Sequence, residues 1–156
     1  MNKLQFALYY EIALKIAIFA HCGQKDIGNE PYILHPLLVY ENCHTDKGKI
    51  TALLHDVIED SDLTIEDIKK RIPDEEILIA LKLLTKSNED RSGQGYQCYL
   101  CRIRNNPIAC EVKMADLRHN MDLSRISRPL TNWDFRRQEK YRKSLEYLQQ
   151  KNISFS

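Results

Sequence analysis

The segment 55–60 combines one imidazole with three carboxylates, directly after an apolar stretch. Two polar pairs, His55-Asp56 and Glu59-Asp60, lie four residues apart, so on a helix each residue of the first pair shares a face with its counterpart in the second. Apolar residues before and between the pairs indicate that such a helix is largely buried. Because buried charges need a partner or a metal ion, the segment predicts a metal site.

Polar side chains suited to binding also occur in two other segments. His35 begins a predicted helix, where a lone histidine more often packs or caps than binds a ligand. Further along, Lys113, Asp116 and Asn120 share one face of a predicted helix, whereas His119 is expected to point elsewhere. Taken alone, Asp116 is more often a solvated charge than a ligand. These residues become candidates only in combination.

Two weaker signals come from a loop and from the cysteines. The loop from Gly23 to Asn29 has single glycines and Lys25, which make a weak phosphate-binding signal. Five cysteines with scattered spacing do not resemble a disulfide framework. Cys98 and Cys101 have the spacing of half a zinc site, but no second Cys or His pair stands at a matching distance. Reduced, partly buried thiols in a cytoplasmic protein are the preferred interpretation.

Length and composition narrow the class of protein. A chain of 156 residues predicts one domain, 1–156, with a single core. A net charge of +1 gives no electrostatic argument for binding nucleic acid or an acidic membrane. There is no apolar run of about 18 residues that could span a membrane, and the N-terminal segment, with Glu11 and Lys15, favours an amphipathic helix over a secretory peptide. We therefore expect a cytoplasmic protein that binds neither nucleic acid nor a membrane, and the sequence leaves a homo-oligomer open.

Helices must position these groups, because helical periodicity dominates and no strand alternation competes with it. Thr64 and Asp67 have the spacing of a capping box. The segment from Ser87 to Gly95 is a predicted loop, either a lid or a solvated connection. The predicted helices span residues 4–20, 35–40, 49–58, 65–71, 73–84, 96–104, 108–121 and 132–149. The expected fold class is all-α, a single bundle of about seven or eight helices.

Three phrases of the sequence carry the candidate residues in a fixed order. They are Glu-Pro-Tyr-x-x-His-Pro at 30–36, Ala-Leu-Leu-His-Asp-Val-Ile-Glu-Asp at 52–60 and Val-Lys-Met-Ala-Asp-x-x-His-Asn-Met at 112–121. Together they resemble the hydrolase domain of the Rel/Spo family, within the HD superfamily of metal-dependent phosphohydrolases. The resemblance covers about residues 4–121 and implies an HD-domain helical bundle. Since the chain is too short for the family's synthetase or regulatory regions, it is similar to the stand-alone small alarmone hydrolases, including the Mesh-type enzymes.

The resemblance implies a ligand set and a cofactor. His35, His55, Asp56 and Asp116 match the positions that bind one divalent metal, which is Mn²⁺ in this family. Two nitrogen and two carboxylate ligands suit Mn²⁺, Fe²⁺ or Zn²⁺, so ligand chemistry alone does not choose among them. A water activated by the metal would then attack the phosphate.

The resemblance also implies roles in catalysis and substrate binding. Glu59 and Asp60 match the family's catalytic carboxylates, one turn beyond the ligands, where a base or a water-positioning group is needed. The candidates for contact with a nucleotide substrate are Lys25, Tyr32, Lys113, Asn120, Arg136 and Tyr141.

One departure from the family pattern concerns the substrate. Asp26 and Ile27 stand where alarmone hydrolases usually carry an Arg-Lys pair, which in the family packs against the guanine. An acid and an aliphatic side chain cannot supply that cation stacking, although Lys25 lies one position earlier.

Three hypotheses about function follow. The favoured one is a Mn²⁺-dependent enzyme that removes the 3′-pyrophosphate from (p)ppGpp. An HD phosphohydrolase acting on another nucleotide or phosphorylated metabolite is the alternative that Asp26 and Ile27 favour. An inactive metal-binding domain with a regulatory or interaction role is the third, disfavoured because Glu59 and Asp60 are both present.

Overall fold

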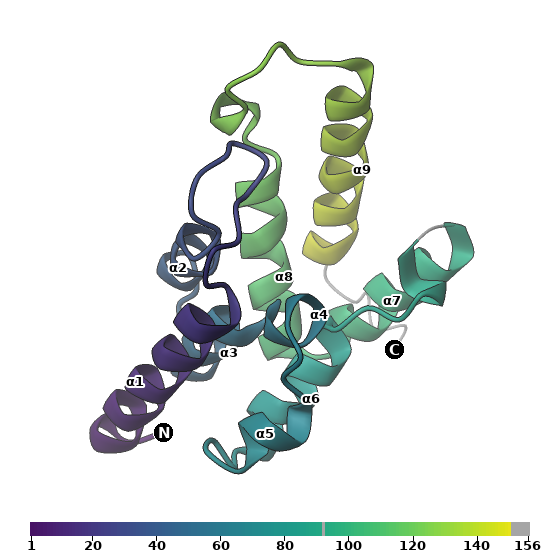
Figure 1. The fold of residues 1–156 in the computed structure, drawn as a ribbon. Helices are drawn as coiled ribbons and strands as arrows, with labels where there is room; N and C mark the ends of the chain where they lie inside the picture. The colour runs from purple at the N-terminus through teal and green to yellow at the C-terminus, as the bar shows by residue number, and fades with distance from the viewer. Residues whose placement is uncertain (92, 151–156) are drawn as a thin grey trace, which may run out of the picture.

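Apolar residues at helical spacing form the helices of this chain, which bury their apolar sides against one another (Figure 1). The computed structural model describes residues 1–91 and 93–150. Within them the helices are α1 (Lys3–Ala20), α2 (Leu34–Glu41), α3 (Asp46–Leu54), α4 (Val57–Asp60), α5 (Ile65–Lys69), α6 (Glu75–Leu84), η1 (Glu89–Arg91), α7 (Gly93–Arg104), α8 (Pro107–Asn120), η2 (Leu123–Arg125) and α9 (Asn132–Gln149). The described residues contain one isolated β-bridge and no strand, so the all-α prediction is confirmed.

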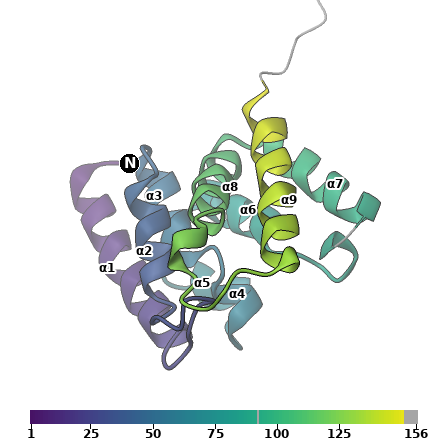
Figure 2. The ribbon, with the colours of Figure 1, turned by 90° about the horizontal axis from the view of Figure 1, so that it is seen from above.

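Helices α3 and α6 join two groups of buried apolar side chains. One group lies among α1, α3, α5 and α6, and the other among α6, α7, α8 and α9. Seen from above, α1 to α3 lie on one side, α8 lies in the middle, and α7 and α9 lie on the other side (Figure 2). On α3, Leu53 belongs to the first group and Ala52 to the second. The helix that leads into the His-Asp pair is therefore fixed from both sides.

The predicted helix 49–58 is wrong, because two helices meet there. Helix α3 ends at Leu54, and Asp56 has φ −101° and ψ −6°, away from helical values, before α4 begins at Val57. Adjacent positions on a regular helix point about 100° apart, whereas His55 and Asp56 face one common centre. Asp56 and Asp60 are still one helical turn apart as predicted, because the amide of Asp60 donates to the carbonyl of Asp56 over 3.0 Å.

The predicted loop 87–95 is also partly helical. It contains η1 and the start of α7, while residue 92 lies outside the described residues, so the prediction of a lid stays untested. A Cβ on Gly95 would lie 1.8 Å from the carbonyl oxygen of Glu89, so only glycine allows η1 to pack this closely against α7. Gly95, which the sequence analysis counted toward a loop, is needed for this close packing.

The predicted capping box and the predicted limits of the last helix are confirmed. Thr64 and Asp67 form the predicted capping box at α5, with the Asp67 amide donating to Thr64 Oγ1 over 3.3 Å and the Thr64 amide donating to Asp67 Oδ2 over 3.1 Å. Helix α9 has the predicted limits. Across the described ranges, no helix is both long and apolar enough to cross a bilayer.

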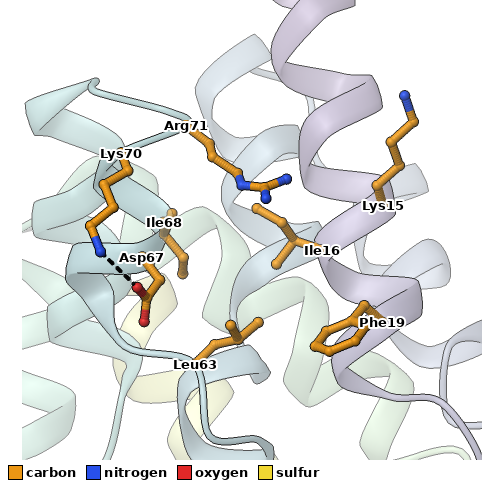
Figure 3. Close-up of a pocket in the computed structure, with 8 residues that line it drawn as sticks. All are labelled: Lys15, Ile16, Phe19, Leu63, Asp67, Ile68, Lys70 and Arg71. Carbon is orange, nitrogen blue, oxygen red and sulfur yellow. Dashed lines mark hydrogen bonds and ion pairs between the residues drawn. The ribbon is translucent and has the colours of Figure 1, made fainter.

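A hollow of about 450 Å³ lies between α1 and α5, away from the polar segments (Figure 3). Its lining is apolar at Ile16, Phe19, Leu63 and Ile68 and charged at Lys15, Asp67, Lys70 and Arg71. Phe19 is 74% exposed. This surface contains none of the residues that the sequence selects for chemistry.

The packing of α3 predicts a large stability loss on truncation of its core. Leu53 is completely buried, so Leu53→Ala should lower the free energy of unfolding by about 2–5 kcal/mol. Leu8, on the outer side of α1, is 55% exposed, so Leu8→Ala should change it by about 0.5 kcal/mol or less. Urea denaturation followed by circular dichroism measures both, and equal losses would contradict this packing.

Candidate active site

Four side chains from three parts of the chain meet at one buried point. His35 comes from the first turn of α2, His55 and Asp56 from the break after α3, and Asp116 from α8. The Nε2 atom of His35 lies 3.2 Å from Asp116 Oδ1 and 3.4 Å from Asp56 Oδ2, and His55 Nε2 lies 3.0 Å from the same Asp56 oxygen. Ligand atoms of His35, His55 and Asp116 all lie within 4.8 Å of one another. The four residues predicted as ligands are thus close together.

The donor atoms at this point fit a divalent metal. His55 donates its Nδ1–H to the carbonyl of Ala52 over 2.8 Å, which leaves the lone pair on Nε2. That Nε2 atom is buried and makes no hydrogen bond, although Asp56 is adjacent. Buried polar atoms without a partner are rare in native proteins, and a metal ion would supply the missing partner.

Asp116 is oriented by two neighbours on α8. As predicted, Lys113 and Asn120 share its face: the Lys113 ammonium donates to Asp116 Oδ2 over 2.6 Å, and Asn120 Nδ2 donates to Oδ1. Burial alone would raise the pKa of Asp116, but Lys113 and His35 hold it well below its usual range. Asp116 is therefore an anion whose Oδ1 faces the histidines.

Asp56 is held in a similar way from the other side. The Tyr32 hydroxyl donates to Asp56 Oδ2 over 2.6 Å. Burial raises the pKa of Asp56, but the charges of His55 and His35 outweigh it and keep the pKa well below normal. Burial lowers the pKa of His35, yet hydrogen bonds with Asp116 and Asp56 raise it to about 9. The two carboxylates thus favour a positive charge between them, whether proton or metal.

A pocket of about 320 Å³ opens onto this centre, within the size range of small-molecule sites. Most of its lining side chains are charged, with carboxylates beside the ligand cluster and cations from η1, α8, α9 and the segment before η1. The lining residues are Tyr32, Asp56, Glu59, Asp60, Lys86, Arg91, Tyr96, Lys113, Asp116, Asn120, Arg137, Lys140 and Tyr141. Such a pocket suits an anionic ligand.

Glu59 and Asp60 occupy different surroundings in this pocket. Glu59 Oε1 accepts the backbone N–H of Lys86 over 2.8 Å, and Arg91 lies 3.8 Å from Oε2. Burial and the negative charge of Asp56 raise the pKa of Asp60. Glu59 is therefore fixed in place, whereas Asp60 takes up a proton more readily than an exposed aspartate does.

Two predicted substrate contacts lie outside the pocket. Lys25 is exposed and borders a separate hollow beside Pro31, and Arg136 lines a neighbouring hollow. The next residue, Arg137, lines the pocket instead, with its Nη2 donating to Asn120 Oδ1 and its Nε to the Tyr141 hydroxyl, both over 3.2 Å. Spacing on the final helix could not choose between adjacent arginines without the position of α8. Tyr32, Lys113, Asn120 and Tyr141 do line the pocket.

The expectation that His119 points away from the site is wrong. Its Nδ1 atom lies 2.6 Å from His35 Nδ1, and the two rings stack with centroids 4.9 Å apart. His119 follows Asp116 by three residues, a spacing that places both on one side of a helix. The cations Lys86, Arg91 and Lys140 were also missed, because nothing in their local sequence distinguishes them from solvated surface charges.

The alternative zinc site at the cysteines gains no support. All five cysteines are free thiols, and Cys98 and Cys101 are exposed on α7. Among the described residues, the one group of side chains close enough to share a metal ion is His35, His55 and Asp116.

A helical bundle that brings two histidines and two aspartates together below a charged pocket defines the HD-type class of metal-dependent hydrolases. No protein-family model matches the chain. Among curated proteins, the guanosine-3′,5′-bis(diphosphate) 3′-pyrophosphohydrolase MESH1 of Drosophila melanogaster is 32% identical over 82% of this chain and 75% of its own length. The chain belongs to this family of 3′-pyrophosphohydrolases.

Other relatives are much longer proteins. The 3′-pyrophosphohydrolase of Borreliella burgdorferi is 42% identical over 49% of this chain, but the match covers only 12% of that protein, and the GTP pyrophosphokinase of Streptomyces coelicolor is matched over 14% of its length. A solved structure described as a metazoan ortholog of SpoT that hydrolyses ppGpp has a TM-score of 0.75 at 22% identity. It covers 93% of this chain and 88% of the other, which establishes the fold.

The Lys113–Asp116 pair predicts a strong effect of removing one buried charge. Lys113→Met would leave Asp116 buried without its cation, so the free energy of unfolding of the metal-free protein should fall by roughly 3–5 kcal/mol. Lys47, partly exposed, pairs with Asp74 and Glu76, and Lys47→Met should cost about 1 kcal/mol or less. Thermal and urea unfolding measure the two losses, and similar losses would refute the role given to Lys113.

Proposed function

We propose that this chain removes the 3′-pyrophosphate from (p)ppGpp with the help of a divalent metal, Mn²⁺ by preference. The observation that carries the proposal is a pocket of about 320 Å³ that opens onto the cluster of four ligand residues and is lined by two further carboxylates and several cations. The 3′-pyrophosphohydrolase activity for which MESH1 and the other relatives are named supports this substrate.

His35, His55, Asp56 and Asp116 would hold the metal. When bound, the metal would lower the pKa of water and neutralise charge that develops on phosphorus. Two imidazole nitrogens with two carboxylate oxygens suit Mn²⁺ and equally Fe²⁺ or Zn²⁺, so Mn²⁺ is the choice that family membership favours.

The remaining pocket residues divide the work on the substrate. Asp60, with its raised pKa, would take the proton from the attacking water, while Glu59 would orient that water. Lys86, Arg91 and Arg137 would neutralise the phosphate oxygens. The Arg137 guanidinium, held by Asn120 and Tyr141, keeps part of its planar fork free for a phosphate group.

A second candidate function is hydrolysis of another nucleotide or phosphorylated metabolite on the same metal centre. The observation that favours it is the state of Asp26, whose carboxylate pairs with Arg125 and accepts the backbone amides of Gly28 and Glu30. In the family this loop packs against guanine. Here it carries a carboxylate at position 26 that is already bonded to groups of the protein itself. Family membership and the presence of both Glu59 and Asp60 argue against the inactive-domain hypothesis.

We also propose that residues 1–156 form one domain, of which 151–156 lie outside the described residues, and that the protein is cytoplasmic. Five free cysteines are consistent with a reducing compartment. The exposed apolar residues Leu4 and Phe19 on α1 would suit a homo-oligomer.

The proposal predicts metal-dependent turnover that fails without Asp56. Purified protein with Mn²⁺ should release pyrophosphate from (p)ppGpp faster than from any of a panel of nucleotides, and chelation should abolish the activity. Asp56→Ala should lose both metal binding and turnover. Faster hydrolysis of several panel members would favour the second candidate, and full activity of Asp56→Ala would contradict the metal mechanism.

The roles proposed for Glu59 and Asp60 predict that replacing either residue slows hydrolysis without weakening metal binding. Glu59→Gln and Asp60→Asn should each lower kcat by roughly 10²–10⁴-fold, as expected for loss of a general base or its positioning partner. Both variants should keep the Mn²⁺ affinity of the native protein in isothermal titration. Loss of metal binding in either variant would reassign that residue to ligation.

A further inference from the structure

The loop after α1 is connected to the metal centre by an unbroken chain of polar contacts. Asp26 pairs with Arg125, whose Nη1 lies 3.1 Å from His119 Nδ1 and donates to the His119 carbonyl over 3.1 Å. His119 Nδ1 in turn lies 2.6 Å from Nδ1 of His35. The loop and the η2 turn lie beside each other (Figure 1). This chain of contacts, Asp26–Arg125–His119–His35, is called the relay below.

The relay has a fixed direction because a guanidinium only donates hydrogen bonds. Arg125 therefore makes His119 Nδ1 an acceptor, and the proton of the neutral His119 ring sits on Nε2, which is buried and has no hydrogen-bond partner among the described residues. The hydrogen bond between the two imidazoles then requires His35 to donate its Nδ1–H. When the His35 ring is neutral, as a metal ligand must be, that donation leaves its lone pair on Nε2, the atom that faces Asp56 and Asp116.

Packing of the loop holds the outer end of this relay. The side chains of Asp26 and Arg125 are only 11% and 18% exposed. Asp26 Oδ1 accepts the amides of Gly28 and Glu30 over 2.8 and 3.0 Å, which leaves Oδ2 for Arg125. A Cβ on Gly28 would lie 2.3 Å from the Arg125 carbonyl oxygen, so glycine permits the close approach of the loop to η2.

We propose that Asp26, Arg125 and His119 are positioning residues that set the orientation and tautomer of the metal ligand His35. Asp26 thus serves the metal centre from the place where the family carries a basic residue for the substrate. This inference rests on the metal site of the proposed function. Partners that orient a ligand histidine typically change metal affinity or activity by about 10–100-fold when removed.

The test compares Asp26→Asn with a matched control, Asp74→Asn. Asp74 has a similar arrangement: its Oδ1 accepts two backbone amides, from Glu76 and Ile77, and the ammonium of Lys47 lies 3.1 Å from its Oδ2 and 3.2 Å from its Oδ1. In each variant the new amide oxygen can still accept the backbone N–H groups, while the charge for the cation is lost. Isothermal titration with Mn²⁺ alone should show about tenfold weaker binding for Asp26→Asn and unchanged binding for Asp74→Asn.

A second pair of variants tests the middle of the relay independently. His119→Asn can keep an acceptor near the position of Nδ1 and should retain most of the Mn²⁺ affinity, whereas His119→Leu removes the acceptor and should lose about tenfold or more. Equal affinities for this pair, or for Asp26→Asn and native protein, would overturn the inference.

Nitrogen NMR of the histidines separates this inference from the proposed function, because it needs no metal. The metal-free protein should show His119 protonated at Nε2 and not at Nδ1. If native protein fails to bind divalent metal, the proposed function falls, while this spectrum still decides the direction of the relay. A proton on His119 Nδ1 would refute the relay even if the metal binds.

Discussion

The rest of the site depends on one electrostatic constraint: two ionised carboxylates, the buried Asp116 and the partly buried Asp56, lie beside the same histidines. Two ionised carboxylates in a buried setting need positive charge, and the fold supplies part of it through Lys113, which is itself 6% exposed. His35 and His55 face the same point with Nε2. The break between α3 and α4 follows from this constraint, since a continuous helix would turn His55 and Asp56 to different sides.

Around this centre, some charged side chains are paired with other protein groups, whereas others are available to a ligand. Lys113, predicted as a substrate contact, lines the pocket, but its ammonium is paired with Asp116. Arg137 also lines the pocket, with its guanidinium in contact with Asn120 and the Tyr141 ring. At the other side, Asp26 pairs with Arg125, which contacts His119 beside His35. Asp56 and Asp116 face the histidines and also line the pocket, so the ligand cluster and the pocket wall share residues.

The sequence predicts well those features that are local or that belong to a recurring motif. Helical spacing and caps locate α9 and the Thr64 capping box, and the three motif phrases bring out the residues that meet at the centre. Features that depend on a distant element could not be predicted. The choice of Arg137 over Arg136 depends on where α8 lies against α9. The place of Lys86 in the pocket depends on its position beside Glu59, which accepts its backbone N–H and lies 27 residues earlier in the chain. His119 is different, since its spacing from Asp116 already placed it on the ligand side.

The central claim is that the His35, His55, Asp56 and Asp116 side chains form one divalent-metal site at the base of the charged pocket. Anomalous diffraction from crystals of the protein grown with Mn²⁺ tests this claim most directly. The account predicts one strong manganese peak within bonding distance of His35 Nε2, His55 Nε2 and both aspartates, and no such peak in crystals of Asp56→Ala. A manganese peak elsewhere in the molecule, with these four side chains left unchanged around an unoccupied centre, would contradict it.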